Sequence, residues 1–409
     1  MNLKAKKIAL GITGSIAAYK ACAVVRELKR AGHEVRVAMT ASAQKFVSAL
    51  TFATLSENPV MNALFEETEK VGVVHIDLAR WCDAFLVCPA TANILSKVAN
   101  GVADEMVSTT IMATKSPVIF CPAMNTAMWE NALVQENVEK LLKHGYEFVD
   151  PEWGEMATQA EGEGAGRLAE TSHILQKLKY ILFASKELDG KKVLVTAGAT
   201  REAIDPVRFI SNHSSGKMGF ALAEAAKLKG AEVVLVAGAT QLPKPYGIKY
   251  RQVTTVDEMK QAVEEEYQNT DILIMAAAVS DYKPATISNH KIKKSDSKFQ
   301  LHFQKTPDVL ADLGKQKLNR IHVGFALETE NSVANATKKL HAKNLDLIVL
   351  NNPLEPGAAF ASDTNIVTTI DREGTVEKKP KMPKSEVAEI IMDKVCHLYD
   401  KKYRSAAIA

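Results

Sequence analysis

The chain has few cysteines: five in 409 residues, with no Cys-x-x-Cys pair. Because no metal-ligand spacing occurs among cysteine and histidine, we name no metal-ligating residue and expect free, buried thiols in a reducing compartment. No apolar run approaches the length of a membrane span. The sequence enters an apolar strand at 8–12 without a signal-peptide pattern. We therefore expect a cytoplasmic protein with no membrane partner.

An excess of one charge sign is also missing. The chain has 51 basic and 48 acidic residues, and its formal net charge is +3. These charges are spread along the sequence, so they form no polyanion-binding stripe, and we expect no nucleic-acid partner. Hydrophobic residues make up 46% of the chain, which is enough for the cores of two or three soluble domains.

What the chain does have is a regular alternation of apolar strands and amphipathic helices. This order predicts parallel sheets with helices on both faces. The polar segment 185–190 precedes a fresh apolar strand, so we predict a linker there between domains at 1–184 and 191–409. The predicted fold class is α/β, with two tandem doubly wound, Rossmann-like domains.

The expected elements follow from hydrophobic periodicity and from Gly and Pro breaks. In the first half we predict strands at 8–12, 35–39, 84–88 and 117–121, helices at 16–31, 92–99, 127–144 and 172–183, and a Gly- and Glu-rich loop at 154–167. In the second half we predict strands at 192–196, 232–236, 272–276, 322–326 and 345–350, helices at 216–229, 256–267, 332–343 and 384–399, and a hairpin of 366–370 with 375–378.

The most informative run is 195–219, between a buried strand and a helix that begins near Gly216. A strand-to-helix turn normally takes 2–6 residues, whereas this one takes about twenty. It is rich in Gly, Ser, Asn and Arg, which is typical of a loop that wraps a phosphorylated ligand.

A second glycine turn, Gly11 to Lys20, joins the first strand to its helix and is a weak signal by itself. A dinucleotide site would need an acidic residue after the second strand to hold the ribose hydroxyls. That strand ends at Thr40-Ala41, and its counterpart in the second half ends at Gly238-Ala239. Neither end has an acid, so both turns fit a mononucleotide or another phosphorylated ligand better.

Several motifs occur together in one order. The first half contains 14–20 (GSIAAYK), His75 in a β-type run, 89–93 (PATAN) and the specific pattern 122–129 (PAMNTAMW). The second half contains 195–219, 276–282 (AAAVSDY), the Lys291 cluster, 306–308 (TPD), 324–326 (GFA) and 344–346 (NLD). With these motifs the whole chain resembles the bacterial bifunctional phosphopantothenoylcysteine decarboxylase/phosphopantothenate–cysteine ligases of coenzyme A synthesis.

For the first half, the resemblance implies a flavodoxin-like flavoprotein domain with FMN, which oxidises the substrate thiol and so creates an electron sink for loss of CO2. The implied cofactor-binding residues are Gly14, Ser15, Thr40, Ala90 and Thr91. Asn125 would bind the substrate carboxylate, and His75 would orient the substrate or assist deprotonation. Met128 and Arg167 complete the implied substrate site. Without the other motifs, His75 would be interpreted as a structural histidine.

For the second half, the resemblance implies a ligase that activates 4′-phosphopantothenate with CTP and then joins the acyl-cytidylate to L-cysteine. Lys291 would stabilise phosphate charge and Asn212 would hold the acyl-cytidylate. The implied substrate-binding residues are Arg208, Met275, Ala276, Ala277, Asp281, Pro307, Asp308, Val309, Leu310, Phe325, Lys339 and Lys343. Taken alone, Phe325 would be read as core and the last two lysines as a solvated helix face. Mg²⁺ or another divalent cation is expected with the triphosphate.

One departure from the family is clear. The family's loop carries a cysteine that donates a proton to the enethiolate, and here Ala160 holds its place. Either another group or water donates the proton, or this half is impaired or stops at the enethiol. We favour a substitute donor because the rest of the site is intact.

Two other classes remain open: a flavin-fold regulatory protein, and a decarboxylase of peptide C-terminal cysteines. The retained ligase motifs argue against both. The resemblance also implies a homo-oligomer, with trimeric flavin domains, dimeric ligase domains and up to a dodecamer in all.

Overall fold

The computed structural model describes residues 5–65, 73–293, 300–352 and 362–406. These residues divide into two compact units at Phe183/Ala184. The segment 185–190, which we predicted as a linker, packs against the second unit: the N–H groups of Ser185 and Leu188 donate to the carbonyls of Leu228 and Lys229. The boundary between the units therefore lies just before this segment.

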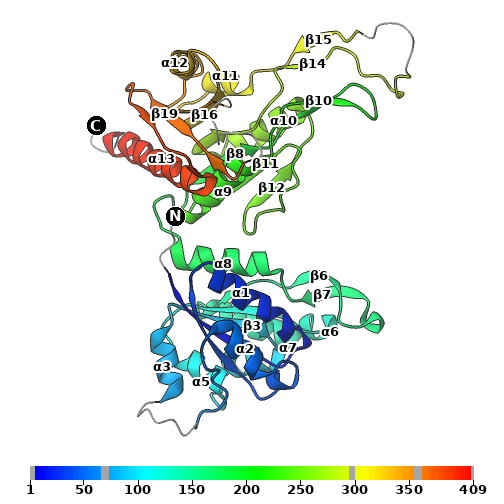
Figure 1. The fold of residues 1–409 in the computed structure, drawn as a ribbon, viewed down its shortest axis with the longest axis vertical. Coiled ribbons are helices and arrows are strands. Elements are labelled where there is room, and N and C mark those ends of the chain that lie inside the picture. Colours follow the sequence, from blue (N-terminus) through cyan, green and yellow to red (C-terminus); the bar gives the residue numbers. More distant parts are fainter. Residues whose placement is uncertain (1–4, 66–72, 294–299, 353–361, 407–409) are drawn as a thin grey trace. The chain divides into compact units, whose positions relative to one another are not determined.

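The first unit is built on a parallel sheet in the order β2-β1-β3-β4-β5 (Figure 1). Its strands are β1 Lys7–Ile12, β2 Glu34–Met39, β3 Ala84–Ala90, β4 Val118–Pro122 and β5 Glu147–Phe148. This order is the flavodoxin-like one, in which the chain reverses direction across the sheet between β1 and β3. The predicted flavodoxin-like fold of this half is confirmed.

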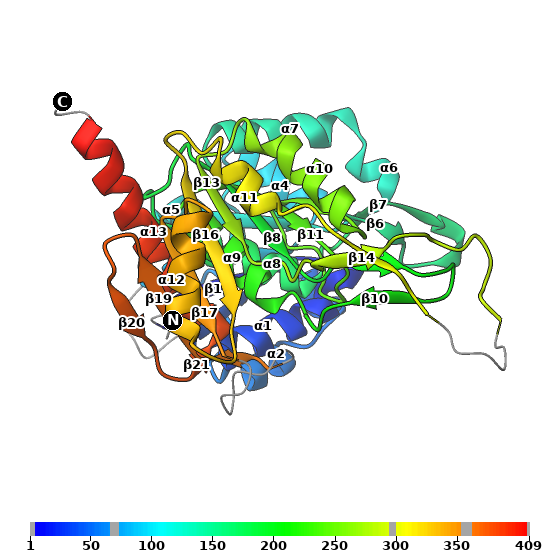
Figure 2. The same cartoon turned by 90° about the horizontal axis from the view of Figure 1, so that it is seen from above.

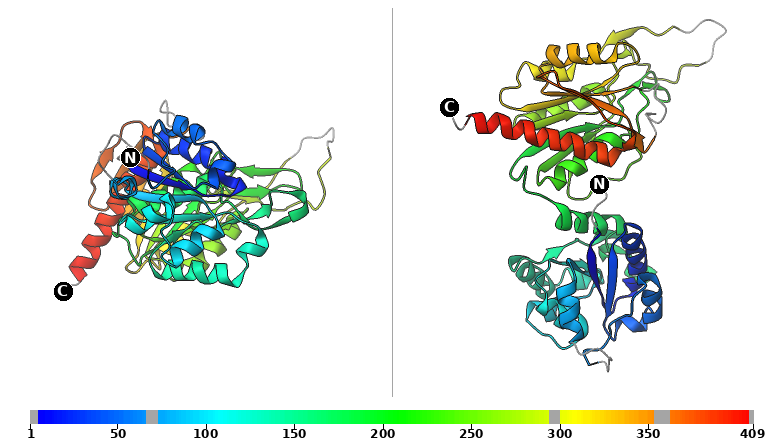
Figure 3. Two further views of the ribbon diagram at one scale, coloured as in Figure 1. Left: turned by 90° about the horizontal axis from the view of Figure 1, so that it is seen from below. Right: turned by 60° about the vertical axis from the view of Figure 1, so that its left-hand side comes forward.

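Helices cover both faces of this sheet, which explains why its strands are continuous apolar runs. In the right-hand view of Figure 3 the blue strands lie between cyan helices and blue helices. The helical segments are η1 Ile16–Lys20, α1 Ala21–Arg30, η2 Ala43–Lys45, α2 Ala49–Ser56, α3 Val74–Trp81, α4 Ala92–Ala99, α5 Met106–Ala113, α6 Thr126–Trp129, α7 Ala132–Lys143, η3 Gln159–Glu161 and α8 Thr171–Phe183.

Three predictions for this unit need correction. The helix predicted at 127–144 is two helices, α6 and α7, because the Asn131 side chain accepts from Leu133 N (3.0 Å) and caps a new helix. The loop predicted at 154–167 contains an antiparallel hairpin of β6 Glu152–Glu155 and β7 Glu163–Arg167. The β-type run around His75 is helix α3, because burial of Leu78 and Ala79 outweighs its β-branched residues.

The second unit has an eight-stranded sheet in the order β12-β11-β8-β13-β16-β17-β19-β20. Its strands are β8 Lys192–Ala197, β11 Glu232–Ala237, β12 Lys249–Gln252, β13 Ile272–Met275, β16 Ile321–Leu327, β17 Leu347–Asn351, β19 Val367–Asp371 and β20 Val376–Lys378. From β12 to β17 the pairs are parallel in the Rossmann order 3-2-1-4-5-6, so the predicted doubly wound fold is confirmed. β19 and β20 form the predicted hairpin.

The helices of this unit are α9 Lys217–Leu228, α10 Val256–Tyr267, α11 Val309–Gly314, α12 Ser332–Ala342 and α13 Lys384–Ala406. Along β8, Val193 and Val195 face the core under α9 and α13, whereas Leu194 faces α10, α11 and α12. Full burial of each such side chain contributes about 1.5–3 kcal/mol. Figure 2 shows α12 beside β17. The hydrophobic cores on the two faces of the sheet hold the carboxyl ends of β8, β13 and β16 at the same edge of the sheet.

The long run 195–219 is not a plain loop. It contains an antiparallel hairpin of β9 Arg201–Ala203 and β10 Phe209–Ser211 before α9 begins. The remaining short strands are β14 Tyr282–Pro284, β15 Phe303–Lys305, β18 Thr364–Asn365 and β21 Met382–Pro383.

The five cysteines are free; Cys22 is half-buried and the other four are buried, so the expected burial is confirmed for those four. No helix in the described ranges combines the length and the apolar character needed to cross a membrane.

Candidate functional sites

The first candidate site lies at the β1/β3 switch point of the first unit. Loops that follow β1, β2 and β3 enclose a cavity of about 480 Å³. Ligands of open α/β sheets bind at this position, beyond the carboxyl ends of the strands. Of the residues predicted to bind cofactor, Gly14, Ser15, Thr40 and Thr91 line this cavity, and so does Met128. Ala90 is fully buried in β3 and is not part of the lining.

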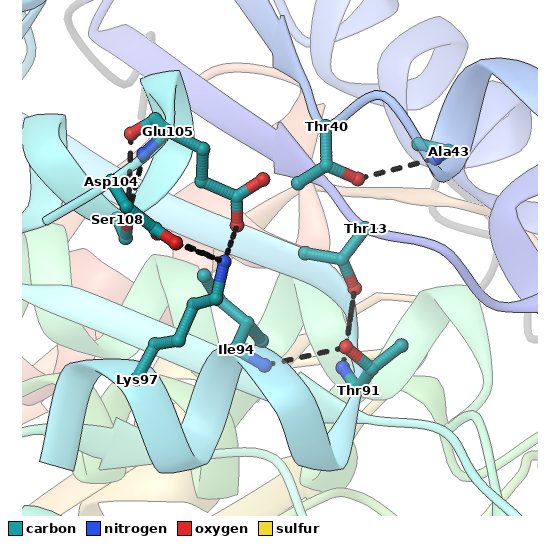
Figure 4. Close-up of polar contacts among 9 residues, drawn as sticks. All are labelled: Thr13, Thr40, Ala43, Thr91, Ile94, Lys97, Asp104, Glu105 and Ser108. Carbon is teal, nitrogen blue, oxygen red and sulfur yellow. Dashed lines mark hydrogen bonds and ion pairs between the residues drawn. The ribbon is translucent and has the colours of Figure 1, made fainter. Parts of the chain in front are cut away.

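Thr13, which the sequence analysis missed, joins two of these loops. Its hydroxyl donates to the carbonyl of Pro89 (2.7 Å) and accepts from the N–H of Thr91 (3.2 Å). The Thr91 hydroxyl in turn accepts from Ile94 N and caps α4 (Figure 4). The first N–H groups of α4 have no acceptors within the helix, so this wall favours an anionic or hydrogen-bond-accepting ligand.

Gly14 allows the loops after β1 and β2 to meet. A Cβ at this position would lie 2.4 Å from Cβ of Ser42, which is far closer than side-chain atoms approach. The next residue, Ser15, accepts from Ala17 N (3.3 Å) and caps the helical turn η1. The glycine-serine pair therefore forms a tight cradle of backbone donors.

Charged side chains from α4 and from the N-terminus of α5 also line this cavity. Lys97 Nζ lies 2.8 Å from a carboxylate oxygen of Asp104 and 3.6 Å from Oε1 of Glu105 (Figure 4). Burial raises the pKa of Glu105, and within the described part of the chain its Oε1 has no hydrogen-bond partner. A cradle of donors, a cation and a buried carboxylate oxygen that accepts no hydrogen bond within the described ranges together suit a phosphorylated ligand that also has polar ring atoms.

A second cavity, of about 330 Å³, adjoins the first and shares Ser15, Ala123 and Met124 with it. Its lining includes the predicted Asn125 and Arg167. The Asn125 carboxamide accepts from Ala127 N (2.9 Å) and donates from Nδ2 to Oε1 of Glu161 (2.8 Å). A substrate bound here would lie directly beside a ligand in the first cavity.

The β6–β7 hairpin closes this second cavity. The N–H of Met124 donates to the carbonyl of Gly166 (3.0 Å), and a Cβ on Gly166, whose φ is +122°, would lie 2.3 Å from the Met124 oxygen. The Gly-x-Gly-Arg motif is thus needed for close contact between backbones. It delivers Arg167 to the cavity, where its guanidinium pairs with Glu170.

His75 takes a different place from the other predicted residues. It lies on α3, is half-buried, and does not line the two cavities described above. Its Nδ1 is buried, and we find no hydrogen-bond partner for it in the ranges that the structure describes.

In the second unit two cavities adjoin at the carboxyl ends of β13 and β16. The first, of about 500 Å³, is lined by most of the predicted residues: Met275, Ala277, Asp281, Pro307, Asp308, Val309, Leu310, Phe325, Lys339 and Lys343. The second, of about 560 Å³, is lined by Asn212 and Ala276. The two cavities share Ala277, Val279, Asp281, Phe325 and Lys339.

The polar groups of this double cavity are already oriented. Asn212 donates from Nδ2 to the carbonyl of Val279 (3.0 Å). Lys339 pairs with Glu328 (2.6 Å), and Lys343 pairs with Asp308 (2.8 Å), whose carboxylate also caps α11. Two cations at the C-terminal end of α12, Lys339 and the C-cap residue Lys343, thus line the cavity, each in an ion pair with a carboxylate that a polyphosphate could replace.

Arg208 and Lys291 are the two predicted ligase residues that the structure does not bring into these cavities. The Arg208 guanidinium pairs with Asp205 (2.6 Å) and donates to the carbonyl of Ile292 (2.6 Å). Lys291 is exposed in the segment after β14, next to Ile292 and shortly before residues 294–299, which lie outside the described ranges.

Sequence reasoning missed the threonines that shape this edge. Thr196 accepts from Ala277 N (3.1 Å), and Thr200 accepts from Ser280 N (3.1 Å), so both hold the chain that leaves β13. The spacing Thr-x-x-x-Thr at a strand end was the available signal.

Lys384, at the start of α13, also lines the second cavity of this unit. Burial lowers its pKa, and its Nζ donates a hydrogen bond to the carbonyl of Ser362 (2.6 Å).

Two protein-family models match the chain: Flavoprotein over residues 1–182, and DNA/pantothenate metabolism flavoprotein C-terminal domain over residues 188–399. A flavoprotein domain is therefore followed by a domain of the pantothenate-metabolism class.

Among curated relatives, the coenzyme A biosynthesis bifunctional protein CoaBC of Bacillus subtilis (strain 168) is 44% identical over 97% of this chain and 98% of its own. A cysteine/cysteine sulfinic acid decarboxylase of an unknown prokaryotic organism is 42% identical over 86% of this chain and 99% of its own. A crystal structure of a CoaBC C-terminal domain, 41% identical, covers 53% of this chain and all (100%) of that chain with a TM-score of 0.46. The chain belongs to the CoaBC family, which confirms the resemblance.

Proposed function

We propose that the chain catalyses two steps of coenzyme A biosynthesis: CTP-dependent ligation of 4′-phosphopantothenate to L-cysteine in the second unit, and FMN-dependent decarboxylation of the product in the first. The observation that carries this proposal is that each unit has two adjoining cavities at the carboxyl edge of its sheet. In each pair, one cavity suits a nucleotide-like ligand and the other the reacting substrate. Family membership supports the same assignment.

In the ligase unit, Lys339 and Lys343 are the cations proposed for the triphosphate, and Phe325 lies where both cavities meet. Asn212, in the second cavity, is proposed to hold the acyl-cytidylate. Negative charge grows at phosphorus in the transition state, so Lys291 is proposed to approach it when substrate binds. No cluster of three or more His, Cys, Asp or Glu side chains in the described ranges could hold a metal ion. We propose that Mg²⁺ enters bound to the triphosphate.

In the flavin unit, bound FMN would supply reversible two-electron redox chemistry at the carbon that carries the substrate thiol. The Gly14–Ser15 cradle and the α4 N-terminus are proposed to hold its polar groups. Asn125 is proposed to bind the substrate carboxylate through Nδ2, and Arg167 to attract the substrate's negative charge. His75 is proposed to act near the flavin of a neighbouring subunit, consistent with its absence from the lining of the two cavities.

The relative named as a cysteine/cysteine sulfinic acid decarboxylase raises a second candidate substrate for the flavin unit, free cysteine. One experiment separates these proposals. Purified protein is incubated with 4′-phosphopantothenate, cysteine and either CTP or ATP, and pyrophosphate, CO2 and product masses are measured. We expect all three products with CTP. CO2 from cysteine alone would favour the second candidate, and a purified protein without a flavin spectrum would contradict the decarboxylase.

Lys291→Gln tests the separation of the two activities. We expect ligation to fall by about a hundredfold or more, because one cation is lost at the transferring phosphoryl group. Decarboxylation of supplied phosphopantothenoylcysteine should be unchanged. Lys293→Gln, another exposed lysine in the same segment, is the matched control and should retain both activities. Loss of both activities in Lys291→Gln would contradict two independent sites.

We also propose a cytoplasmic homo-oligomer with trimeric flavin units and dimeric ligase units. Native mass spectrometry of the full chain tests this assembly. A subunit number divisible by three and by two is expected, and a monomer would contradict it.

A further inference from the structure

The hairpin loop that lacks the family's cysteine holds a carboxylate in the substrate cavity. Glu161, the residue after Ala160, lies with its Oε1 2.8 Å from Nδ2 of Asn125. Its Oε2 accepts from the N–H (3.2 Å) and the hydroxyl (3.1 Å) of Thr158. Both oxygens are therefore positioned by the protein, although the side chain is exposed to solvent.

Glu161 accepts from Nδ2 of Asn125, the same amide group that is proposed to bind the substrate. Asn125 is the residue proposed to bind the substrate carboxylate, and its Oδ1 is already used to cap α6. Its Nδ2 is thus the group available to an incoming carboxylate. A bound substrate therefore brings its own carboxylate next to that of Glu161.

Two adjacent carboxylates around one donor repel each other, and this repulsion raises the pKa of the pair. Hydrogen bonds from Asn125 and Thr158 hold the pKa of Glu161 below its usual value in the structure, so without substrate it is a carboxylate. The other charged or titratable side chains that line the cavity are Tyr19, Lys20, Glu155 and Arg167, the last paired with Glu170. The substrate carboxylate adds like charge at close range, and the pair then takes up a proton.

Resting on the decarboxylase activity proposed above, we propose that Glu161 is the proton donor of the flavin unit, in place of the family's cysteine. It gains a proton when the substrate carboxylate binds beside it. It gives that proton to the carbon that has lost CO2.

The proposed step balances without any added reagent. Loss of CO2 from the oxidised substrate leaves its bonding electron pair in an enethiolate, C=C–S⁻. The C=C pair takes the proton from the Glu161 carboxyl group while a sulfur electron pair forms C=S. Glu161 becomes a carboxylate again, and the resulting thioaldehyde is neutral. Departure of CO2 also removes the neighbouring negative charge that kept Glu161 protonated. The pKa of Glu161 then falls, which favours transfer of its proton to the enethiolate.

Glu161→Gln tests the donor, because a glutamine keeps the shape and, through Oε1, the acceptor for Asn125, but it turns an amide nitrogen toward Thr158 and carries no transferable proton. With supplied phosphopantothenoylcysteine we expect CO2 release in the first turnover to continue. The saturated product should fall by about 10²–10³-fold, and an enethiol lighter by two hydrogens should accumulate. Glu163→Gln, on the same hairpin and outside the cavity lining, should behave as the unaltered protein. Ala160→Cys added to Glu161→Gln should restore saturated product.

A binding measurement provides a readout that is independent of turnover. Calorimetry in buffers of different ionisation enthalpy counts the protons taken up when the flavoprotein binds the serine analogue, whose hydroxyl is not oxidised. About one proton per site is expected for the unaltered protein and none for Glu161→Gln. Full saturated product from Glu161→Gln, or equal loss of CO2 release and product, would overturn this inference. An unaltered protein that releases no CO2 would instead overturn the proposed decarboxylase.

Discussion

The carboxylate of Asp205 accepts a hydrogen bond from the backbone N–H of Ile292, 3.1 Å away. The same buried carboxylate accepts from the N–H groups of Val207 and Arg208 and from the Arg208 guanidinium. Arg208 in turn donates to the carbonyl of Ile292. Both backbone groups of the residue after Lys291 are therefore fixed to the β9–β10 hairpin, and we infer that Asp205 and Arg208 position Lys291.

Asp205→Asn should weaken ligation. Each Asp205 oxygen accepts from at least two donors, so an amide nitrogen in either orientation would face donors instead of acceptors. Displacement of Lys291 should lower ligase kcat/KM by about a hundredfold and leave decarboxylation of supplied phosphopantothenoylcysteine unchanged. Steady-state assays of both half-reactions measure this split.

The control for this variant is Asp257→Asn, which removes an exposed carboxylate paired with Lys283 of β14 and leaves the Ile292 contacts in place. Ile292→Pro is a second test: it removes the N–H from which Asp205 accepts, and it also fixes φ at residue 292 and restricts the backbone of Lys291. Normal ligation in Ile292→Pro would show that the hydrogen bond between Ile292 and Asp205 does not position Lys291. Arg208 could instead bind phosphopantothenate directly. In that case Arg208→Lys should raise only the KM for phosphopantothenate and leave kcat unchanged.

The hairpin contacts illustrate which part of the site could be predicted from sequence. Motif residues near the carboxyl ends of parallel strands, such as Asn125 after β4 and Phe325 in β16, lie in cavities because the parallel topology brings all carboxyl ends to one edge of the sheet. Glu161 and Asp205 belong to no periodic pattern. Their roles depend on side-chain contacts across 36 and 87 residues, which local sequence does not encode.

Gly14→Ala should reduce flavin binding. The added methyl group would clash with Cβ of Ser42, so the loop after β1 must move away from the loop after β2. The backbone donors of the cradle would move with it, and we expect the Kd for FMN to rise by about tenfold or more. Flavin absorbance per purified chain and FMN titration of the deflavinated protein measure the change.

Ser42→Gly provides a compensating change for Gly14→Ala. It removes the Cβ at 2.4 Å and leaves only backbone atoms of Ser42 at 3.3 Å and beyond, which a small shift accommodates. The double variant should recover most of the flavin that Gly14→Ala loses. Equal loss in the single and double variants would show that the conformation of residue 14, and not the contact with residue 42, limits binding.

Secondary structure was predictable where local and tertiary preferences agree. The helices at 92–99 and 256–267 have the predicted bounds because Thr91 and Thr255 cap them. The predicted β-type run at His75 was wrong, because the packing of α3 outweighs its β-branched residues. The predicted loop at 154–167 was also wrong, because Gly162 and Gly166, both with positive φ, permit a hairpin that composition alone does not reveal.

The ion pair of Lys317 and Asp346 is the most buried in the second unit among the pairs described: Nζ lies 2.7 Å from the carboxylate, and the side chains are 4% and 11% exposed. Burial lowers the pKa of Lys317 to about 8, although its partner Asp346 opposes this change. An unfolded lysine has a pKa of about 10.4. Between these values the unfolded chain binds more protons at this site than the folded one.

The free energy of unfolding should therefore rise with pH, relative to a variant that lacks this amine, from about pH 8 to about pH 10.4. Lys317→Met is that variant, and below pH 8 its stability difference from the unaltered protein should be constant. Urea unfolding followed by circular dichroism measures the difference, while tryptophan fluorescence reports only the first unit, because Trp81, Trp129 and Trp153 all lie there. Lys315→Met, which removes an exposed lysine two positions away, should show no such pH dependence. A pH-independent difference for Lys317→Met would mean that the buried amine keeps its proton, because the attraction of Asp346 then outweighs the cost of burial.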